Sequence, residues 1–510
     1  MRTSAVLALA AAAEAAYNTQ PLVTSEQLQE LITIEDLLAG SQKLQDIADA
    51  HEGNRAFGSG GHNATVDYLY ETLSALQSGN SSYYDVVKQP FTELFFAGTA
   101  TLSVDGAEYD ASTMTYTPSG TVSGVSLVPV ADLGCSIEDF PAEVEGKVAF
   151  ISRGTCPFAQ KATNAKTAGA AAALIYNNAP GAIAGTLGGA GDYVPVVGVS
   201  QETGNELLAA LEASEEDVLV DLVIDAVTEY RTNYNVIAET KGGDRDNVLV
   251  LGGHSDSVPA GPGINDDGSG TIGVLNVAVA LSQFSVTNAV RFAFWGAEEF
   301  GKLGSFYYVK QLNGTGSNGT TGGAAEMNKI RAYLNFDMIA SPNYVYGIYD
   351  GDGSAFNLSG PAGSAQLERD FEDFYTSKGA PFAPSEFSGR SDYQAFIENG
   401  IPSGGLFTGA EVVKTEAEAA LFGGEAGVAY DANYHQAGDT VDNLALDAYL
   451  LNTQSIANSV AKYALSFESL PPVDPLKRRW AADRAKLFSR AAHSHAHAHA
   501  GPCGQGSELV

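Results

Sequence analysis

The sequence predicts an α/β fold with a mostly parallel central sheet flanked by helices, and with a β-rich domain inserted into it. From Tyr234 onward, apolar strand candidates, polar loops and helix candidates follow one another in turn, which is typical of a parallel sheet. Residues 108–226 differ, because short strands rich in Val, Ala and Gly alternate there with turns. The length of 510 residues also exceeds one ordinary domain.

The main domain is expected to comprise residues 41–107 and 227–467. Residues 41–77 have the apolar spacing of helices, and strand-like segments follow at Val86–Leu94 and Thr99–Val104. The later strand candidates are Asn247–Gly252, Val290–Phe294, Ile330–Phe336, Val345–Tyr349 and Gly404–Phe407. The helix candidates between and after them are Val274–Leu281, Ala365–Tyr375, Tyr393–Glu398 and Leu446–Leu465. In such a sheet, ligand sites form just past the carboxyl ends of the strands.

The inserted domain, residues 108–226, has strand and helix candidates of its own. The strands are Val122–Val130, Lys147–Ile151, Ala171–Tyr176 and Val194–Val199, and the helix covers Ala159–Ala168. The segments 146–158, 161–173 and 194–199 together resemble a protease-associated domain. They carry no acid/base cluster, so we interpret this domain as a lid or a substrate-access module.

The N-terminus has the features of an export signal over residues 1–15. Arg2 supplies the positive start, Ala5–Ala13 is a short apolar run, and residues 13–15 form a small-residue cleavage pattern. Residues 16–40 are expected to be the mature start or a short pro-segment. The chain also contains glycosylation sequons at Asn63, Asn80, Asn313, Asn318 and Asn357. These features favour a secreted, extracellular glycoprotein.

The last segment, residues 468–510, is expected to be a disordered tail. It contains a basic cluster at 477–479 and histidines at positions 493, 495, 497 and 499. These histidines either bind metal loosely or remain solvated.

The charge of the chain is strongly negative, with 27 basic and 61 acidic residues and a net charge of −34. Such a surface repels nucleic acid and anionic membranes, and no basic stripe argues otherwise. No apolar stretch is long enough to span a bilayer. We therefore expect neither nucleic acid nor a membrane among the partners, and we expect a monomer.

Cysteines are few, at positions 135, 156 and 503. In an oxidising compartment we predict that Cys135 and Cys156 form a bridge, whereas the alternative is two free thiols. Three cysteines do not provide a thiolate zinc cage, so a bound metal must use His, Asp and Glu.

Metal-ligand residue types follow several of the predicted strands. They are His254 with Asp256, Glu298 with Glu299, Asp337, Asp266 with Asp267, and His435 after Tyr434. Each piece alone has an ordinary structural explanation, such as a helix cap or a solvated acidic face. Together, two histidines and three carboxylates at convergent strand ends suit a pair of zinc ions.

At these motifs the chain resembles the co-catalytic di-zinc aminopeptidases, most closely the fungal-type secreted leucine aminopeptidases. The motifs are Gly252-Gly-His-Ser-Asp-Ser-Val, Gly261-Pro-Gly-Ile-Asn-Asp-Asp-Gly-Ser-Gly, Phe294-Trp-Gly-Ala-Glu-Glu-Phe-Gly, Asn335-Phe-Asp-Met and Tyr434-His435. They occur in the order of the family, and the resemblance covers about residues 21–466.

The resemblance implies a ligand set for two zinc ions. His254 and Asp337 are expected on one zinc, Glu299 and His435 on the other, and Asp266 between both.

The resemblance also implies roles for residues beside the metals. Glu298 is expected to be the catalytic acid/base, because a carboxylate beside an activated water can take its proton and return it to the leaving amine. Asp256 is expected to orient the site. Tyr434 and Arg390 are expected to face the developing oxyanion.

The expected activity is removal of N-terminal residues from peptides or proteins that have a free N-terminus. A preference for leucine-like residues follows from the resemblance alone. Two alternatives stay open: another enzyme of this fold, such as a carboxypeptidase or a glutaminyl cyclase, or a peptidase-like binding protein that has lost catalysis.

Overall fold

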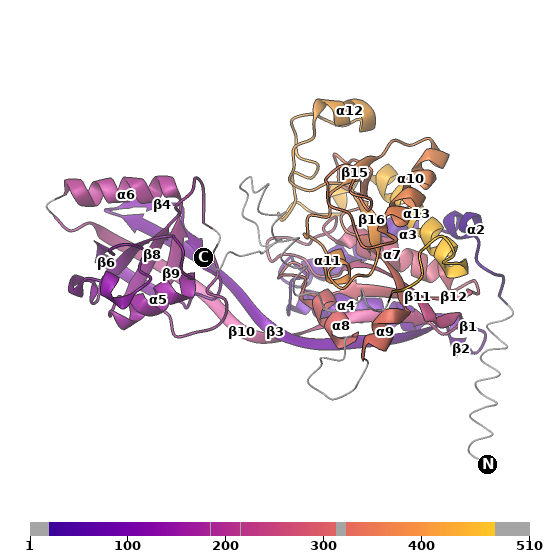
Figure 1. The fold of residues 1–510 in the computed structure, drawn as a ribbon, viewed down its shortest axis with the longest axis horizontal. Helices are drawn as coiled ribbons and strands as arrows, with labels where there is room; N and C mark the ends of the chain where they lie inside the picture. Colours follow the sequence, from indigo (N-terminus) through magenta and orange to yellow (C-terminus); the bar gives the residue numbers. More distant parts are fainter. Residues whose placement is uncertain (1–19, 184, 215, 313–322, 475–510) are drawn as a thin grey trace, which may run out of the picture. The chain divides into compact units, whose positions relative to one another are not determined.

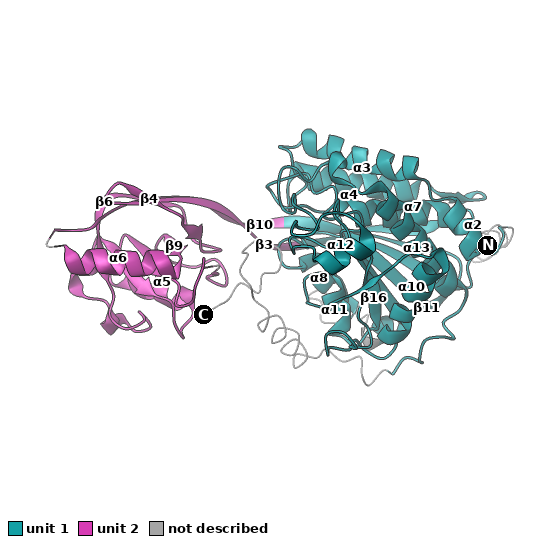
Figure 2. Cartoon of the chain, turned by 90° about the horizontal axis from the view of Figure 1, so that it is seen from above, with its two compact units in different colours: residues 1–91, 232–495 teal, residues 92–231, 496–510 magenta. Residues whose placement is uncertain are grey.

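The computed structural model describes residues 20–183, 185–214, 216–312 and 323–474. These residues form two compact units (Figure 2). Unit 1 contains the described residues up to Phe91 and from Thr232 onward, and unit 2 runs from Thr92 to Arg231. The sequence placed the inserted domain at 108–226. The chain passes from one unit to the other along two long strands, β3 (Tyr84–Val104) and β10 (Leu219–Thr240).

The central sheet of unit 1 is mostly parallel, as the sequence predicts. Its strand order is β15-β14-β16-β13-β11-β12-β10. The neighbours β16, β13, β11 and β12 run parallel, whereas β10 is antiparallel to β12 and β14 is antiparallel to β16. The bounds are β11 Asp244–His254, β12 Asn288–Trp295, β13 Ile330–Phe336, β14 Gly347–Tyr349, β15 Ala383–Ser385 and β16 Ser403–Phe407.

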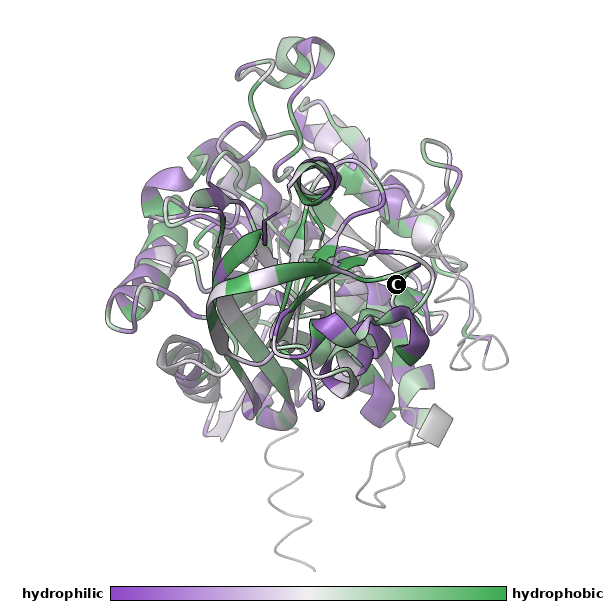
Figure 3. Ribbon diagram, turned by 90° about the vertical axis from the view of Figure 1, so that its left-hand side faces the viewer, coloured by the Kyte–Doolittle hydropathy of each residue, from purple (hydrophilic) through white to green (hydrophobic). Residues whose placement is uncertain are grey.

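Helices cover both faces of this sheet (Figure 1), because alternate strand residues point to opposite sides. On β11, Leu249 and Leu251 belong to one buried cluster, whereas Val248 and Val250 belong to another. The first cluster includes side chains of α3 (Ile34–Asp49), α4 (Gly60–Ser74), α7 (Gly268–Leu281), α10 (Ser364–Lys378) and α13 (Leu446–Leu465). The second includes side chains of α8 (Leu303–Leu312), α9 (Gly323–Lys329) and α11 (Tyr393–Ile397). Hydrophobic residues accordingly concentrate on the strands (Figure 3).

The segment before α3 is part of the core of unit 1. Val23 and Leu28 are fully buried, and the backbone N–H of Val23 donates to the carbonyl of Ser285 at 3.0 Å. The short helix α2 (Ser25–Glu30) packs against α13. The described part of residues 16–40 therefore belongs to the folded domain.

Unit 2 is built around four parallel strands. They are β6 (Gly120–Pro129), β7 (Val148–Ser152), β8 (Ala172–Tyr176) and β9 (Val196–Val199), and β10 pairs antiparallel with β6. The helices are α5 (Phe158–Thr167) and α6 (Gln201–Ala213). A disulfide joins Cys135 to Cys156, which confirms the predicted bridge.

Some elements differ from the sequence-based expectation. The two strands expected at 86–94 and 99–104 form the single strand β3, and helices α2, α6, α8, α9 and α12 (Glu416–Phe422) were not predicted. The remaining strands are short: β1 Gln77–Ser78, β2 Ser81–Ser82, β4 Ala107–Tyr109 and β5 Ser112–Thr113. The predicted export signal, the histidine-rich tail and Cys503 lie outside the described residues. Among the described helices, none has the length and apolarity needed to cross a membrane.

Candidate metal centre

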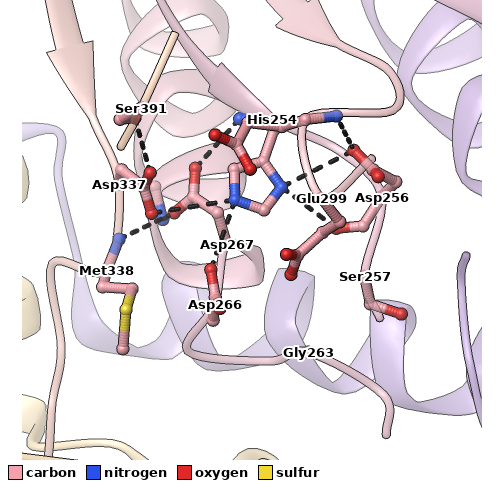
Figure 4. Close-up of polar contacts among 12 residues, drawn as sticks. His254, Asp256, Ser257, Gly263, Asp266, Asp267, Glu299, Asp337, Met338 and Ser391 are labelled. Carbon is pink, nitrogen blue, oxygen red and sulfur yellow. Dashed lines mark hydrogen bonds and ion pairs between the residues drawn. The ribbon is translucent and has the colours of Figure 1, made fainter. Parts of the chain in front are cut away.

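The predicted ligands come together at the carboxyl edge of the unit 1 sheet, and Figure 4 shows His254, Asp266, Glu299 and Asp337 there. His254 is the last residue of β11, Glu299 follows β12 by four residues, and Asp337 comes directly after β13. Because β13, β11 and β12 are parallel neighbours, their carboxyl ends lie side by side. Asp266 precedes α7, and His435 lies in the loop before α13.

Asp266 lies between the two histidines. Its Oδ1 atom is 3.2 Å from Nε2 of His254, and its Oδ2 atom is 3.2 Å from Nε2 of His435. Each histidine also faces a second carboxylate: Oδ1 of Asp337 is 3.7 Å from His254 Nε2, and Oε2 of Glu299 is 3.2 Å from His435 Nε2. The site thus consists of two groups, each with one histidine and one carboxylate, that share Asp266.

This donor set fits a metal. The Nε2 atoms of His254 and His435 are buried and make no hydrogen bond within the described residues. His254 Nδ1 lies 3.2 Å from the carbonyl oxygen of Asp256, which can only accept, so the lone pair of Nε2 is directed into the site. One nitrogen and carboxylate oxygens at each position are ligands that zinc prefers.

The electrostatics of the site also indicate a place for cations. Burial lowers the pKa of His435, but the charge of Glu299 and the contact with Asp266 outweigh it and raise this pKa to about 10. Burial raises the pKa of Asp266, but its contacts with both histidines lower it well below its usual range. The carboxylates therefore make the surroundings of the histidines strongly negative, which favours bound cations.

Glu298 is the residue before Glu299 and lies in the same loop after β12. Its side chain is buried, and burial raises its pKa well above the usual value. Its backbone N–H donates to Oδ1 of Asp256 at 3.0 Å, and the same oxygen lies 3.6 Å from Nδ1 of His254. Asp256 thus connects the loop that carries Glu298 to the histidine at the end of β11.

Tyr434 and Arg390 lie next to each other. The ring of Tyr434 stacks on the His435 ring with 3.8 Å between centroids. Arg390 donates to the Tyr434 hydroxyl at 3.1 Å and to Glu411 at 2.7 Å. Arg390 thus contacts both Tyr434 and Glu411.

Asp267 is a residue that the sequence analysis named beside Asp266 but to which it assigned no role at the site. Its Oδ2 atom accepts the backbone N–H of His254 at 3.0 Å, and its Oδ1 atom accepts those of Gly270 at 2.9 Å and Met338 at 3.0 Å. One carboxylate therefore fixes β11, α7 and the loop after β13. Its position at the start of a helix was the available signal, and it indicated only a cap.

Three further residues that position the ligands were also missed. Ser391 donates to Oδ2 of Asp337 at 2.5 Å, and Asp439 accepts the backbone N–H of Asp266 at 3.0 Å. Arg55 is fully buried and donates to the carbonyls of Ser255 at 2.5 Å, Pro262 at 2.9 Å and Gly263 at 2.6 Å. It thereby holds the loops that carry Asp256 and Asp266.

Comparisons with known proteins agree with this site. The profile of Peptidase family M28 matches residues 235–460, and that of the PA domain matches residues 122–207. A probable leucine aminopeptidase 2 from Aspergillus fumigatus is 54% identical over 492 residues, which cover 96% of this chain and 95% of the relative. Leucine aminopeptidase 2 from Trichophyton rubrum is 49% identical over 454 residues, which cover 89% of this chain and 88% of the relative.

Among solved structures, an aminopeptidase from an Aneurinibacillus species has a TM-score of 0.65 and 26% identity, and the match covers 88% of this chain and 99% of that chain. A zinc aminopeptidase from Bacillus subtilis shares the fold, with a TM-score of 0.59, 24% identity, and coverage of 84% of this chain and 95% of that chain. The chain therefore belongs to peptidase family M28 and carries a PA domain, which confirms the resemblance that its motifs predict.

Proposed function

We propose that this protein is a secreted, monomeric aminopeptidase that uses two zinc ions to release apolar, leucine-like residues from the free N-terminus of peptides. The observation that carries the two-metal part is the position of Asp266, whose two oxygens each face a different histidine at 3.2 Å. The names of the relatives support the aminopeptidase activity and the leucine-like preference.

The ligand assignment follows the two groups at the site. His254 and Asp337 would hold one zinc, His435 and Glu299 the other, and Asp266 would contribute one oxygen to each. Zinc, when bound, polarises the substrate carbonyl and brings the pKa of a water toward neutrality. Metal binding would also offset the negative charge of the carboxylates.

Glu298 is the acid/base in this proposal. Its carboxylate takes the proton of the attacking water and delivers it to the nitrogen of the leaving amine. The raised pKa that burial gives Glu298 suits a group that must hold this proton between the two steps. Asp256 keeps Glu298 in place through the backbone hydrogen bond.

Tyr434 donates its hydroxyl hydrogen to the oxygen that becomes negative during attack. Arg390 can only donate, so the Tyr434 oxygen accepts from it and keeps its own hydrogen for the substrate. In this proposal Arg390 acts through Tyr434, in contrast to the direct contact expected from the sequence.

The end of the peptide that is bound follows from charge. Glu299 and Asp337 supply carboxylates to the site and Glu298 lies beside Glu299; two zinc ions would offset most of this charge, and the remaining acidic oxygens suit a free amine. A carboxypeptidase would need a cation for the substrate carboxylate, and the Arg390 guanidinium is already paired with Glu411. Extracellular location is supported by the predicted export signal and by the exposed sequon residues Asn63, Asn80 and Asn357.

The proposal is tested with purified protein, elemental analysis and three substrates. We expect two zinc ions per chain, hydrolysis of leucine p-nitroanilide and loss of this hydrolysis after chelation. N-acetyl-leucine p-nitroanilide should not be cleaved, because acetylation removes the charge of the amine and adds bulk beside the carboxylates. One zinc per chain would overturn the two-metal mechanism. Cleavage of the acetylated substrate, or release of residues from the carboxyl end of a peptide, would overturn the aminopeptidase.

A further inference from the structure

Besides Tyr434, Arg390 contacts Glu411, and it does so through two hydrogen bonds. Its Nη1 atom donates to Oε1 of Glu411 at 2.7 Å, and its Nη2 atom donates to Oε2 at 3.3 Å. The same Nη2 atom donates to the Tyr434 hydroxyl at 3.1 Å. The Arg390 guanidinium therefore bridges Glu411 and Tyr434 by hydrogen bonds.

The Tyr434 side chain is restrained from two directions. Stacking on the His435 ring, at 3.8 Å between centroids and 24° between planes, defines where the phenol ring lies. The donated hydrogen bond from Arg390 defines how the hydroxyl is oriented, because the oxygen must accept on that side. A rotation of Arg390 would therefore change the direction in which Tyr434 donates.

We propose that Glu411 is a positioning residue for peptide hydrolysis, which orients the Tyr434 hydroxyl by holding Arg390. This inference rests on the proposed role of Tyr434 as an oxyanion donor. Glu411 is neither a metal ligand nor a substrate-binding residue in this scheme. It acts through the planar, two-pronged contact that an arginine and a carboxylate form.

The backbone around Glu411 is itself built against the loop that carries Tyr434. The carbonyl of Ala410 accepts the N–H of Asp431 at 2.8 Å, and the carbonyl of Val412 accepts the N–H of Tyr430 at 2.9 Å. Glu411 is thus held on both sides by residues three and four positions before Tyr434. This arrangement sets the separation between Glu411 and Tyr434 and leaves Arg390 to join them.

The contribution of Glu411 is expected in orientation rather than in stability. The side chains of Arg390 and Glu411 are 41% and 31% exposed, and ion pairs with this exposure add little to the free energy of unfolding. Loss of a residue that orients a catalytic group, by contrast, typically costs about 10- to 100-fold in activity. We therefore expect Glu411→Gln to lower kcat about 10-fold with little change in KM.

The experiment is a double-mutant cycle between Glu411→Gln and Tyr434→Phe in the full zinc-loaded enzyme. If Glu411 acts through Tyr434, the Glu411→Gln change should lower kcat in the wild-type background and have no effect in the Tyr434→Phe background. An equal loss in both backgrounds, or no loss in the wild type, would overturn the inference. If Tyr434→Phe alone leaves kcat unchanged, the proposed oxyanion role of Tyr434 fails, which is a separate result.

Glu418→Gln is the matched control. Glu418 lies in the chain segment that follows Glu411. It accepts hydrogen bonds from the Thr415 N–H at 2.9 Å and from the Tyr430 hydroxyl at 2.7 Å, and among the described contacts none joins it to Arg390. The Glu418→Gln variant should keep kcat close to the wild-type value. A loss of kcat equal to that of Glu411→Gln would mean that loosening of the whole segment causes the effect, and this would contradict the inference. Should Glu411→Gln not fold, Arg390→Lys serves instead. Lysine cannot form the two-pronged contact that the arginine guanidinium makes, so a wild-type kcat in that variant would overturn the inference.

Discussion

Asp256 and Glu298 are joined by a hydrogen bond in which the backbone N–H of Glu298 donates to Oδ1 of Asp256 at 3.0 Å. The contact links the end of β11 to the loop after β12, so the proposed acid/base is held by the same residue that faces His254. Removing this carboxylate should let the Glu298 loop move without removing a metal ligand.

We predict that Asp256→Ala lowers kcat about 10- to 100-fold and retains bound zinc. The reason is the lost anchor of the Glu298 loop and the lost carboxylate beside His254 Nδ1. Steady-state kinetics with zinc analysis checks this. Asp246→Ala is the control, because the Asp246 side chain is 81% exposed and lies near the other end of β11. This variant should have the kcat and the zinc content of the wild type.

Glu298→Gln should keep the fold and the metal but lose at least about 10²-fold in kcat, because the amide cannot take or deliver a proton. Glu299→Gln, one residue further, should instead lose zinc, since Glu299 faces His435 at 3.2 Å. The two variants are compared by kinetics and elemental analysis. A near-wild-type rate, or loss of zinc, in Glu298→Gln would contradict the assignment.

Leu28→Ala should destabilise unit 1 by about 2–5 kcal/mol, which is the usual cost of emptying a fully buried leucine site. Leu28 is 0% exposed, whereas the nearby Leu22 is 51% exposed. Leu22→Ala is therefore the control and should cost far less. Chemical unfolding measures both free energies. Equal effects would mean that the segment around α2 is not part of the stable core.

Cys135→Ser should destabilise unit 2 by about 3 kcal/mol, because the bridge closes a loop with a sequence separation of 21 residues. The transition of unit 2 is followed by calorimetry, and reducing agent should lower the wild-type transition in the same way. Cys503→Ser, outside the described residues, should leave it unchanged. A wild-type transition in Cys135→Ser would contradict a stabilising role for the bridge.

Glu368 should make the stability of unit 1 depend on pH. Burial raises its pKa from 4.5 to about 7 in the folded protein, where Oε2 accepts the N–H groups of Gly351 and Asp352 at 3.0 Å. A raised carboxyl pKa means that the folded state holds the proton more tightly, so stability is lost as pH rises from about 4.5 to about 7. Glu368→Gln should reduce that loss. Unfolding midpoints across this range test it, and identical pH slopes in both proteins would show that Glu368 stays charged.

Much of the fold was readable from local patterns. Strand β13 has the predicted bounds Ile330–Phe336, and all but one of its residues are buried, so the apolar run marked it clearly. Strand β3 was read as two strands, because its 21 residues alternate irregularly between buried and exposed positions. Pairing with β10 keeps it continuous, and that pairing is not visible in a short window of sequence.

The sequence by itself determined the family and the fold class and predicted the types of ligand, because these depend on residue identity, order and apolar periodicity. Tertiary structure decided which side chains position those ligands. Asp267 reaches Met338 across 71 residues, and Asp439 reaches Asp266 across 173. It also decided that Arg390 is held by Glu411 and contacts Tyr434. A hydrogen bond needs two atoms within about 3 Å, and for residues so far apart in the chain only the packing of the whole domain brings them that close.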